Sequence, residues 1–271
     1  MRLGTIRTAE GTRAVRVEGD ELYALPYDDV GALLASPSWA GEARAGERLP
    51  VQDLSWAPVV PTPGKIVCVG LNYRTHILEL GHELPTYPTL FAKYADTLTG
   101  PYDDIVLPAV SQMVDWEVEL AVIVGASLRN ASKEQAVEGI AGYTVCNDVS
   151  VRDWQRRTPE WLQGKIFEAT TPLGPHLVTP DEVDGARDLR VRSVVDGKVM
   201  QEASTADLVF RPGDVVAYVS TILPLRPGDV VVTGTPGGVG HAQKPPVYLQ
   251  DGQVLRTEIE GLGACVNRCV R

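Results

Sequence analysis

Acidic residues occupy alternate positions in one stretch of the sequence, at Asp115, Glu117 and Glu119. Successive side chains of a strand point to opposite faces, so a strand here would gather the three carboxylates on one face. That face continues into Ala121 and Ile123, which argues against a purely solvated edge. Like charges repel on a buried face, and a hard divalent cation such as Mg²⁺, which binds carboxylate oxygens, would remove the repulsion. The alternative is a half-exposed strand with an acidic outer face.

A further carboxylate and a lysine lie downstream. Asp148 comes where a strand-like stretch, residues 143–146, has ended. A side chain at the end of a buried strand is well placed to face a functional site. Lys165 stands between Gly164 and Ile166, where its ammonium group can balance carboxylates or hold an anionic substrate. Taken alone, such a lysine is more often a surface residue.

His76 and Glu79 are three positions apart. In a helical turn both side chains would lie on one face. A carboxylate beside an imidazole stabilises the imidazolium, which makes the histidine a better base. Taken alone, the pair is more often two solvent-facing residues of a helix. His82, His176 and His241 have no comparable partner in the sequence, and we expect His176 and His241 to lie in loops.

A glycine-rich segment, residues 233–240, follows an apolar, strand-like stretch. It is not a phosphate-binding P-loop, because it continues as Gly240-His241 instead of Gly-Lys-Ser/Thr. It does not open a dinucleotide-binding helix either, since Pro245 and Pro246 follow closely. The sequence therefore favours a loop whose backbone N–H groups, with Thr235, approach a carboxylate or carbonyl group.

The elements that must position these residues are mostly strands. Residues 3–7 and 14–17 are predicted to pair as a hairpin. Helices are few, and Ser132 with Gln135 forms a capping box that predicts the start of one. Strands and helices do not alternate regularly, so we predict a β-dominated α+β fold instead of a doubly wound sheet. Further strands are predicted at residues 65–70, 118–124, 142–146, 189–195 and 229–233, and further helical segments at residues 30–34 and 214–222.

The chain has 271 residues, enough to bury a large core without disulfides. Pro58, Pro61 and Pro63 lie close together, and prolines at this density resist both helix and central strand. We therefore predict a linker near residue 60. It divides the chain into a small β-rich N-terminal domain, residues 1–60, and a catalytic domain, residues 61–271.

Composition excludes several classes of partner. The formal net charge is −10, whereas a protein that binds nucleic acid is usually basic. No apolar run approaches the roughly 20 residues needed to cross a membrane, and the N-terminus lacks the apolar stretch of a signal peptide. The four cysteines form no C-x-x-C pair. We therefore expect reduced thiols in the core of a cytoplasmic protein, with neither nucleic acid nor membrane as a partner.

Six motifs in a fixed order resemble those of the fumarylacetoacetate hydrolase (FAH) superfamily, in its smaller, acylpyruvase-like members. The resemblance covers residues 65–263. The motifs are Gly70-Leu71-Asn72-Tyr73 with His76 and Glu79; Pro85, Pro88, Phe91 and Lys93; Asp115-Trp116-Glu117-Val118-Glu119-Leu120; Asn147-Asp148-Val149-Ser150 with Arg152, Asp153 and Gln155; Gly164-Lys165 with Pro172-Leu173-Gly174-Pro175; and Thr233-Gly234-Thr235-Pro236 with Gly238-Val239-Gly240.

The resemblance implies a mixed β-sandwich roll preceded by a small N-terminal domain, and a homodimer. It implies that Mg²⁺ or Mn²⁺ is held by carboxylates that match Glu117, Glu119 and Asp148. The remaining site residues lie in the same motifs. The matching catalytic residues are His76, Glu79 and Lys165, and we assign Gln155, Thr235, Tyr73 and Arg152 to substrate binding.

The resemblance further implies a metal-dependent hydrolase that cleaves a C–C bond of a small acylpyruvate or related β-diketo acid. In this hypothesis the metal chelates the keto acid, and His76, oriented by Glu79, activates a water molecule. Decarboxylation of oxaloacetate and isomerisation of a small keto acid remain alternatives on the same site. A metal-stabilised binding protein without turnover is a further alternative, which the presence of both His76 and Glu79 disfavours.

Overall fold

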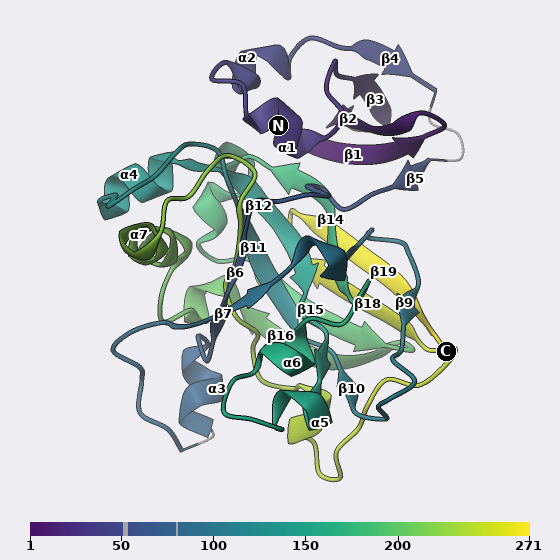
Figure 1. Cartoon of the computed structure of the whole chain (residues 1–271), viewed down its shortest axis with the longest axis vertical. Helices are drawn as coiled ribbons and strands as arrows, with labels where there is room; N and C mark the ends of the chain where they lie inside the picture. Colours follow the sequence, from purple (N-terminus) through teal and green to yellow (C-terminus); the bar gives the residue numbers. More distant parts are fainter. Residues whose placement is uncertain (51–53, 80) are drawn as a thin grey trace.

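The computed structural model describes residues 1–50, 54–79 and 81–271, without the side chain of Glu79. Strands dominate the molecule and most helices are short (Figure 1). This is the β-dominated α+β fold that the sequence predicts.

The largest sheet is mixed and has twelve strands. Its order is β4-β3-β2-β1-β14-β12-β11-β17-β6-β7, with β5 beside β1 and β8 beside β14. Only the β17–β6 and β14–β8 pairs are parallel among the described strands of this sheet. The strands are β1 (Arg2–Thr8), β2 (Gly11–Glu18), β3 (Glu21–Ala24), β4 (Glu47–Leu49), β5 (Ser55–Trp56), β6 (Ile66–Gly70), β7 (Thr89–Lys93), β8 (Leu98–Thr99), β11 (Val118–Val124), β12 (Ile140–Asn147), β14 (Thr171–Val178) and β17 (Val230–Val232).

A second sheet faces the first, and the main core lies between them. Its order is β16-β15-β18-β19-β9, and a separate pair joins β10 to β13. Val118 and Leu120 of β11 share a buried cluster with Val191 of β15 and Ile259 of β18, as expected for packed sheets. The strands are β9 (Ile105–Val106), β10 (Val114–Asp115), β13 (Ser150–Val151), β15 (Arg190–Val195), β16 (Lys198–Ser204), β18 (Val254–Ile259) and β19 (Gly263–Val270).

Most helices are short, and three of them, α3, α5 and α6, contain residues of the site described below. The predicted capping box at Ser132 is confirmed at the start of α4, and α4 packs against α7, where Gly213 leaves room for Val137. The α-helices are α1 (Val30–Leu34), α2 (Trp39–Glu42), α3 (Arg74–Glu79), α4 (Lys133–Glu138), α5 (Arg152–Gln155), α6 (Leu162–Lys165) and α7 (Pro212–Ile222). Short 3₁₀ turns are η1 (Ala95–Thr97), η2 (Pro180–Glu182), η3 (Asp184–Ala186), η4 (Thr205–Asp207) and η5 (Gly240–Ala242).

The N-terminal segment is attached to the rest by backbone pairing. Its predicted hairpin is confirmed as β1 and β2, and β1 also pairs with β14. Leu3 and Leu25 belong to the same buried cluster as Cys68 and Ile123. One sheet and one core thus extend across the predicted boundary near residue 60, and the division into residues 1–60 and 61–271 stays a prediction.

The four cysteines are free and buried, as expected from the sequence. No described helix is long and apolar enough to span a membrane.

His176 lies in strand β14, so the prediction that it is a loop residue is wrong. The prediction rested on the preceding Pro175. The pairing of β14 with β12 shifts register between Gly174 and Val178, and proline is tolerated at such irregularities. The imidazole packs edge-on against Trp56 of the N-terminal segment, with ring centroids 5.0 Å apart.

Burial of His176, with a smaller effect of Arg2, lowers the pKa of its imidazole from 6.5 to about 4. The unfolded chain therefore takes up a proton between these values that the folded chain does not, and stability falls as the pH drops from 6.5 towards 4. The full shift corresponds to at most about 3 kcal/mol. Urea denaturation at pH 7 and at pH 4.5 measures this loss of stability. We expect the loss between the two pH values to be ~2 kcal/mol smaller in His176→Phe than in the wild type. Exposed His82→Gln is the control, and equal pH dependence of all three proteins would contradict the prediction.

Candidate active site

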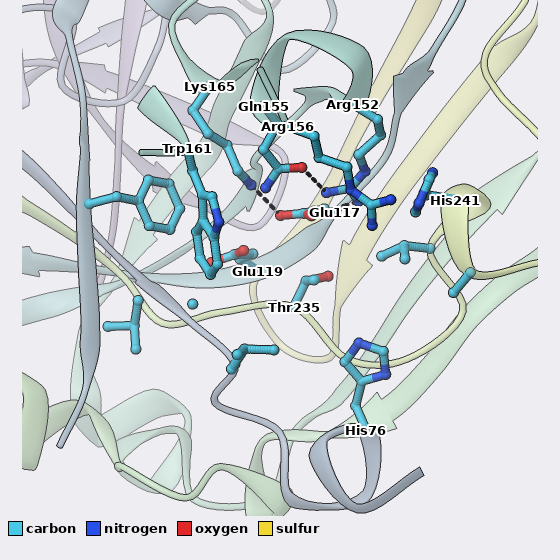
Figure 2. A pocket seen from close by; sticks show the side chains of 16 residues that line it. His76, Glu117, Glu119, Arg152, Gln155, Arg156, Trp161, Lys165, Thr235 and His241 are labelled. Carbon is cyan, nitrogen blue, oxygen red and sulfur yellow. Dashed lines mark hydrogen bonds and ion pairs between the residues drawn. The ribbon is translucent and has the colours of Figure 1, made fainter. Parts of the chain in front are cut away.

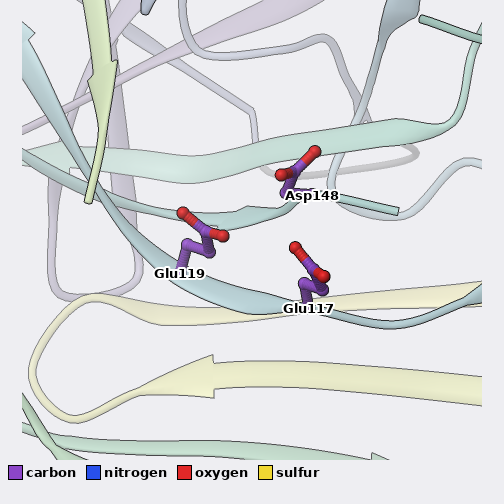
Figure 3. Close-up of side chains that lie close together, drawn as sticks. All are labelled: Glu117, Glu119 and Asp148. Carbon is purple, nitrogen blue, oxygen red and sulfur yellow. The ribbon is translucent and has the colours of Figure 1, made fainter. Parts of the chain in front are cut away.

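Three carboxylates meet at one end of the β11–β12 ladder (Figure 3). The ladder reaches Val118 opposite Asn147, so Glu117 and Asp148 lie just beyond the last pair. The backbone N–H of Asp148 donates to the carbonyl of Glu117 at 2.9 Å. One oxygen from each of Glu117, Glu119 and Asp148 lies within 4.8 Å of the others. The two strands thus bring the predicted metal ligands together.

Two lysines compensate the buried carboxylates. The Lys165 ammonium lies 2.6 Å from a carboxylate oxygen of Glu117 and 2.6 Å from one of Asp148. The Lys93 ammonium lies 2.7 Å from the other oxygen of Asp148. Lys93, Lys165 and Asp148 are each at most 2% exposed. Lys165 is therefore not the surface residue that its type alone would suggest.

The same contacts set the ionisation of the site. Burial raises the pKa of Asp148, but the opposing charges of Lys165 and Lys93 outweigh it and lower this pKa to about 2. Among the described residues, no lysine lies within salt-bridge distance of Glu119. Its burial, together with the carboxylates of Asp148 and Glu117, raises its pKa well above the ordinary range. A positive ion beside Glu119 would offset this repulsion.

Asp115, the first of the three alternating acidic residues, has a different role. Its two oxygens accept hydrogen bonds from the backbone N–H groups of Gly240 and His241, at 2.7 and 2.9 Å, and from the Arg152 guanidinium at 2.8 Å. Arg152 also lies 2.7 Å from Glu117. Asp115 therefore fixes the glycine-rich loop and Arg152 next to the three carboxylates.

The donor set of this cluster fits a hard divalent cation. Glu117, Glu119 and Asp148 offer only oxygen ligands, and Mg²⁺ and Mn²⁺ favour such donors. When all groups are ionised, these three carboxylates and Asp115 carry four negative charges. The neighbouring Lys93, Lys165 and Arg152 carry three positive charges. A bound dication would change the local charge from −1 to +1, which suits an anionic ligand.

The carboxylates open onto a cavity of about 430 Å³ (Figure 2). Asp148 is 0% exposed and lies beneath the surface of the cavity. Tyr73 is fully buried in the main core and does not line the cavity. The structure therefore does not place it where the predicted contact with substrate requires. The predicted residues that line it are His76, Glu117, Glu119, Arg152, Gln155, Lys165 and Thr235.

Two glycines allow the elements that form the cavity wall to pack tightly. A Cβ on Gly164 would lie 2.4 Å from the backbone nitrogen of Gln155, so glycine is needed where α6 crosses α5. This crossing brings Lys165 and Gln155 to the same cavity. A Cβ on Gly70 would lie 2.3 Å from the indole ring of Trp161, so Gly70 leaves the space in which that ring packs.

His76 lies on α3, at the cavity wall across from Lys165 (Figure 2). Buried Asn72 fixes the segment before the helix, because its amide donates to the carbonyls of Phe210 and Thr233 at 2.9 and 2.8 Å. Asp207 accepts a 3.0 Å hydrogen bond from the backbone N–H of Thr75 in the first turn. The predicted partner of His76, the Glu79 side chain, lies outside the described residues.

The glycine-rich loop binds carboxylates of the chain itself, as its sequence favours. The backbone N–H of Gly234 donates to Glu119 at 2.5 Å. The Thr235 hydroxyl donates to the carbonyl of Val118 at 3.0 Å and accepts from the amide of Gln201. The loop therefore orients Glu119 and presents Thr235 to the cavity.

Sequence reasoning gave no role to several residues that shape this site. Phe91, Arg156 and His241 line the cavity, and Lys93 is paired with Asp148. The expected loop residue His241 lies in η5, which Asp115 holds against the site. Phe91 and Lys93 belong to the second of the six motifs, and the signal for Lys93 in the sequence is a lysine that follows an apolar run.

Glu119→Gln keeps the shape of the side chain but removes a negative ligand, so we expect Mn²⁺ affinity to fall by more than about 100-fold. Isothermal titration calorimetry of metal-free protein measures this directly. Glu138→Gln, on the exposed face of α4, is the matched control and should bind Mn²⁺ as the wild type does. Unchanged Mn²⁺ binding in Glu119→Gln would contradict the assignment.

The chain is similar in sequence and in structure to known proteins. The human protein named oxaloacetate tautomerase FAHD2A, mitochondrial, is 45% identical over 224 residues, which cover 82% of this chain and 71% of that protein. The structure of fumarylacetoacetate hydrolase from Exiguobacterium antarcticum is 32% identical, with a TM-score of 0.89 and coverage of 100% of this chain and 99% of that one.

A third similar protein is maleylpyruvate hydrolase from Sphingobium, solved in complex with manganese(II) ion and pyruvate. It is 28% identical, with a TM-score of 0.83 and coverage of 100% of this chain and 99% of that one. The family model described as fumarylacetoacetate (FAA) hydrolase C-terminal matches residues 65–270. The chain therefore belongs to the fumarylacetoacetate hydrolase family.

Proposed function

We propose that this protein is a metal-dependent enzyme that interconverts the keto and enol forms of a small 2-oxo acid of the oxaloacetate type. The observation that carries the proposal is the buried cluster of Glu117, Glu119 and Asp148, compensated by lysines and opening onto a cavity of about 430 Å³. The choice of tautomerisation is supported by the 45% identity to the human protein named oxaloacetate tautomerase.

In this proposal Glu117, Glu119 and Asp148 hold Mg²⁺ or Mn²⁺. When bound there, the dication supplies Lewis acidity toward a keto oxygen. Lys165 supplies a fixed positive charge beside the ligands, because its carboxylate neighbours outweigh burial and raise the pKa of its ammonium group. A fixed positive charge in a buried site stabilises the negative charge that develops on an enolate oxygen.

Tautomerisation moves one proton from the carbon next to the ketone to the keto oxygen, with no gain or loss of other atoms. His76 lines the cavity and is the proposed base that takes the proton from carbon. Gln155 and Thr235 line the same cavity and are the proposed contacts of the acid, with the Gln155 amide as the hydrogen-bond donor. Arg152 is held by Asp115 and Glu117, so we propose that it adds positive charge to the wall.

Hydrolysis of an acylpyruvate is the second candidate. It would use the same metal ligands, with His76 deprotonating water instead of carbon. The similar maleylpyruvate hydrolase, solved with manganese(II) and pyruvate, supports this alternative. Decarboxylation of oxaloacetate needs the metal site but no attacking water, and it is tested with the same substrates.

Assembly as a homodimer and location in the cytoplasm are further proposals. The homodimer rests on the family, and the cytoplasmic location on four free, buried cysteines. The similar human protein is named as mitochondrial, so compartment can differ among relatives.

A substrate panel tests the reaction. With Mg²⁺ or Mn²⁺, we expect the protein to accelerate the loss of the enol absorbance of oxaloacetate, and EDTA to abolish the effect. Acetylpyruvate is assayed in parallel for pyruvate release, and oxaloacetate for CO₂. Pyruvate release from acetylpyruvate without tautomerisation would replace the proposal with the hydrolase, and CO₂ release without tautomerisation would replace it with the decarboxylase.

His76→Ala tests the proposed base. We expect Mn²⁺ affinity to stay within twofold of the wild type, because His76 is not among the three ligands. The tautomerisation rate should fall by about 10²-fold or more, as for loss of a general base. His82→Ala, a change at an exposed histidine that does not line the cavity, is the control. A wild-type rate in His76→Ala would assign the proton transfer to another residue.

A further inference from the structure

The walls of the cavity differ in chemistry on either side of Glu117. Val69, Phe91 and Trp161 form an apolar wall. Arg152, Arg156 and His241 form a basic wall. Figure 2 shows Trp161 on one side of Glu117 and the three basic residues on the other. A ligand that spans the cavity would therefore meet apolar groups at one side and hydrogen-bond donors at the other.

The two arginines of the basic wall are engaged differently. The Arg152 guanidinium is buried and is bound to Asp115, Glu117 and Gln155. Arg156 follows α5 directly and is exposed at the cavity. Within the described part of the chain, its guanidinium makes no ion pair. Arg152 thus belongs to the framework of the site, whereas Arg156 keeps its charge and its donors for a ligand.

His241 is held in place beside Arg156. Its backbone N–H donates to Asp115 at 2.9 Å, and its Nδ1 lies 2.8 Å from the Tyr248 hydroxyl. The contact with Tyr248 uses Nδ1 and leaves Nε2 for another partner. Burial and the charges of Arg156 and Arg152 lower the pKa of the imidazole, although Asp115 opposes this. The lowered pKa favours the neutral ring, which can offer an N–H group beside the Arg156 charge in the tautomer that carries its proton on Nε2.

Asp115 links this wall to the carboxylate cluster. The same carboxylate binds the backbone of His241 and the guanidinium of Arg152, and Arg152 contacts Glu117. The basic wall is thus fixed relative to the proposed metal ligands. The chain carries a net charge of −10, so this local concentration of donors is what favours the approach of an anionic group.

We propose that Arg156 and His241 bind the second carboxylate of a 2-oxo dicarboxylate whose 2-oxo acid end lies at Glu117, Glu119 and Asp148. Arg156 is then the residue that favours dicarboxylates over 2-oxo monocarboxylates. A guanidinium is suited to this because it binds a carboxylate through two parallel N–H donors. The inference rests on the proposed function for the position of the 2-oxo acid end.

Binding measurements test the subsite without relying on turnover. Isothermal titration calorimetry of the Mn²⁺-loaded protein compares 2-oxoglutarate with 2-oxopentanoate, which has the same carbon chain with a methyl group in place of the second carboxylate. In Arg156→Gln, we expect 2-oxoglutarate to bind about tenfold or more weakly and 2-oxopentanoate to change less than twofold. His241→Leu should weaken 2-oxoglutarate by about threefold to tenfold.

Arg157→Gln is the matched control, because the Arg157 guanidinium stacks on Trp154, 3.5 Å from its ring centroid, and does not line the cavity. It should bind both ligands as the wild type does. Equal affinity of the wild type for both ligands, binding of neither, or equal weakening of both in Arg156→Gln would overturn the subsite.

Kinetics separate the subsite from the proposed function. If the wild type tautomerises oxaloacetate, Arg156→Gln should raise KM about tenfold and leave kcat within about threefold, because the changed contact is remote from the reacting atoms. A fall in kcat with unchanged KM would overturn the binding role. If the wild type does not tautomerise oxaloacetate, the proposed function fails, and the calorimetry still decides whether Arg156 recognises a second carboxylate.

Discussion

The structure around the site depends on the burial of carboxylates that repel one another. Removing a charge from water is costly unless opposite charges and hydrogen bonds compensate it. Here Lys165 bridges Glu117 and Asp148, Lys93 takes the remaining oxygen of Asp148, and Arg152 joins Glu117 to Asp115. Most features of the cavity follow from the need to hold these charges in place.

The strands provide the precision that this arrangement requires. Glu117, Glu119 and Asp148 are fixed by the register of β11 and β12, which form central strands of the large sheet. The surrounding loops then donate backbone N–H groups to buried carboxylates. Gly234 donates to Glu119, and Gly240 donates to Asp115. The ends of two central strands and the loops around them thus build one site together.

The sequence is informative where chemistry follows local periodicity. The capping box at Ser132 predicts the start of α4, and alternation places Glu117 and Glu119 together at the cavity. Asp115 does not join them as alternation predicts, because it lies in β10, which pairs with β13. Tertiary contacts are not visible in this way. Tyr73 is a core residue although it stands beside site residues in the sequence, and Arg156 and His241 meet at one cavity only because Asp115 holds η5 against the site.

The ammonium group of Lys165 has a consequence for how the protein matures. It sits between Glu117 and Asp148 at hydrogen-bonding distance from both, so the chain brings its own counter-charge to the site. Together with Lys93 at Asp148 and Arg152 at Glu117, it compensates the charges of two of the three acidic groups. We therefore expect the chain to fold without a bound metal, unlike small domains that remain unfolded until they bind zinc.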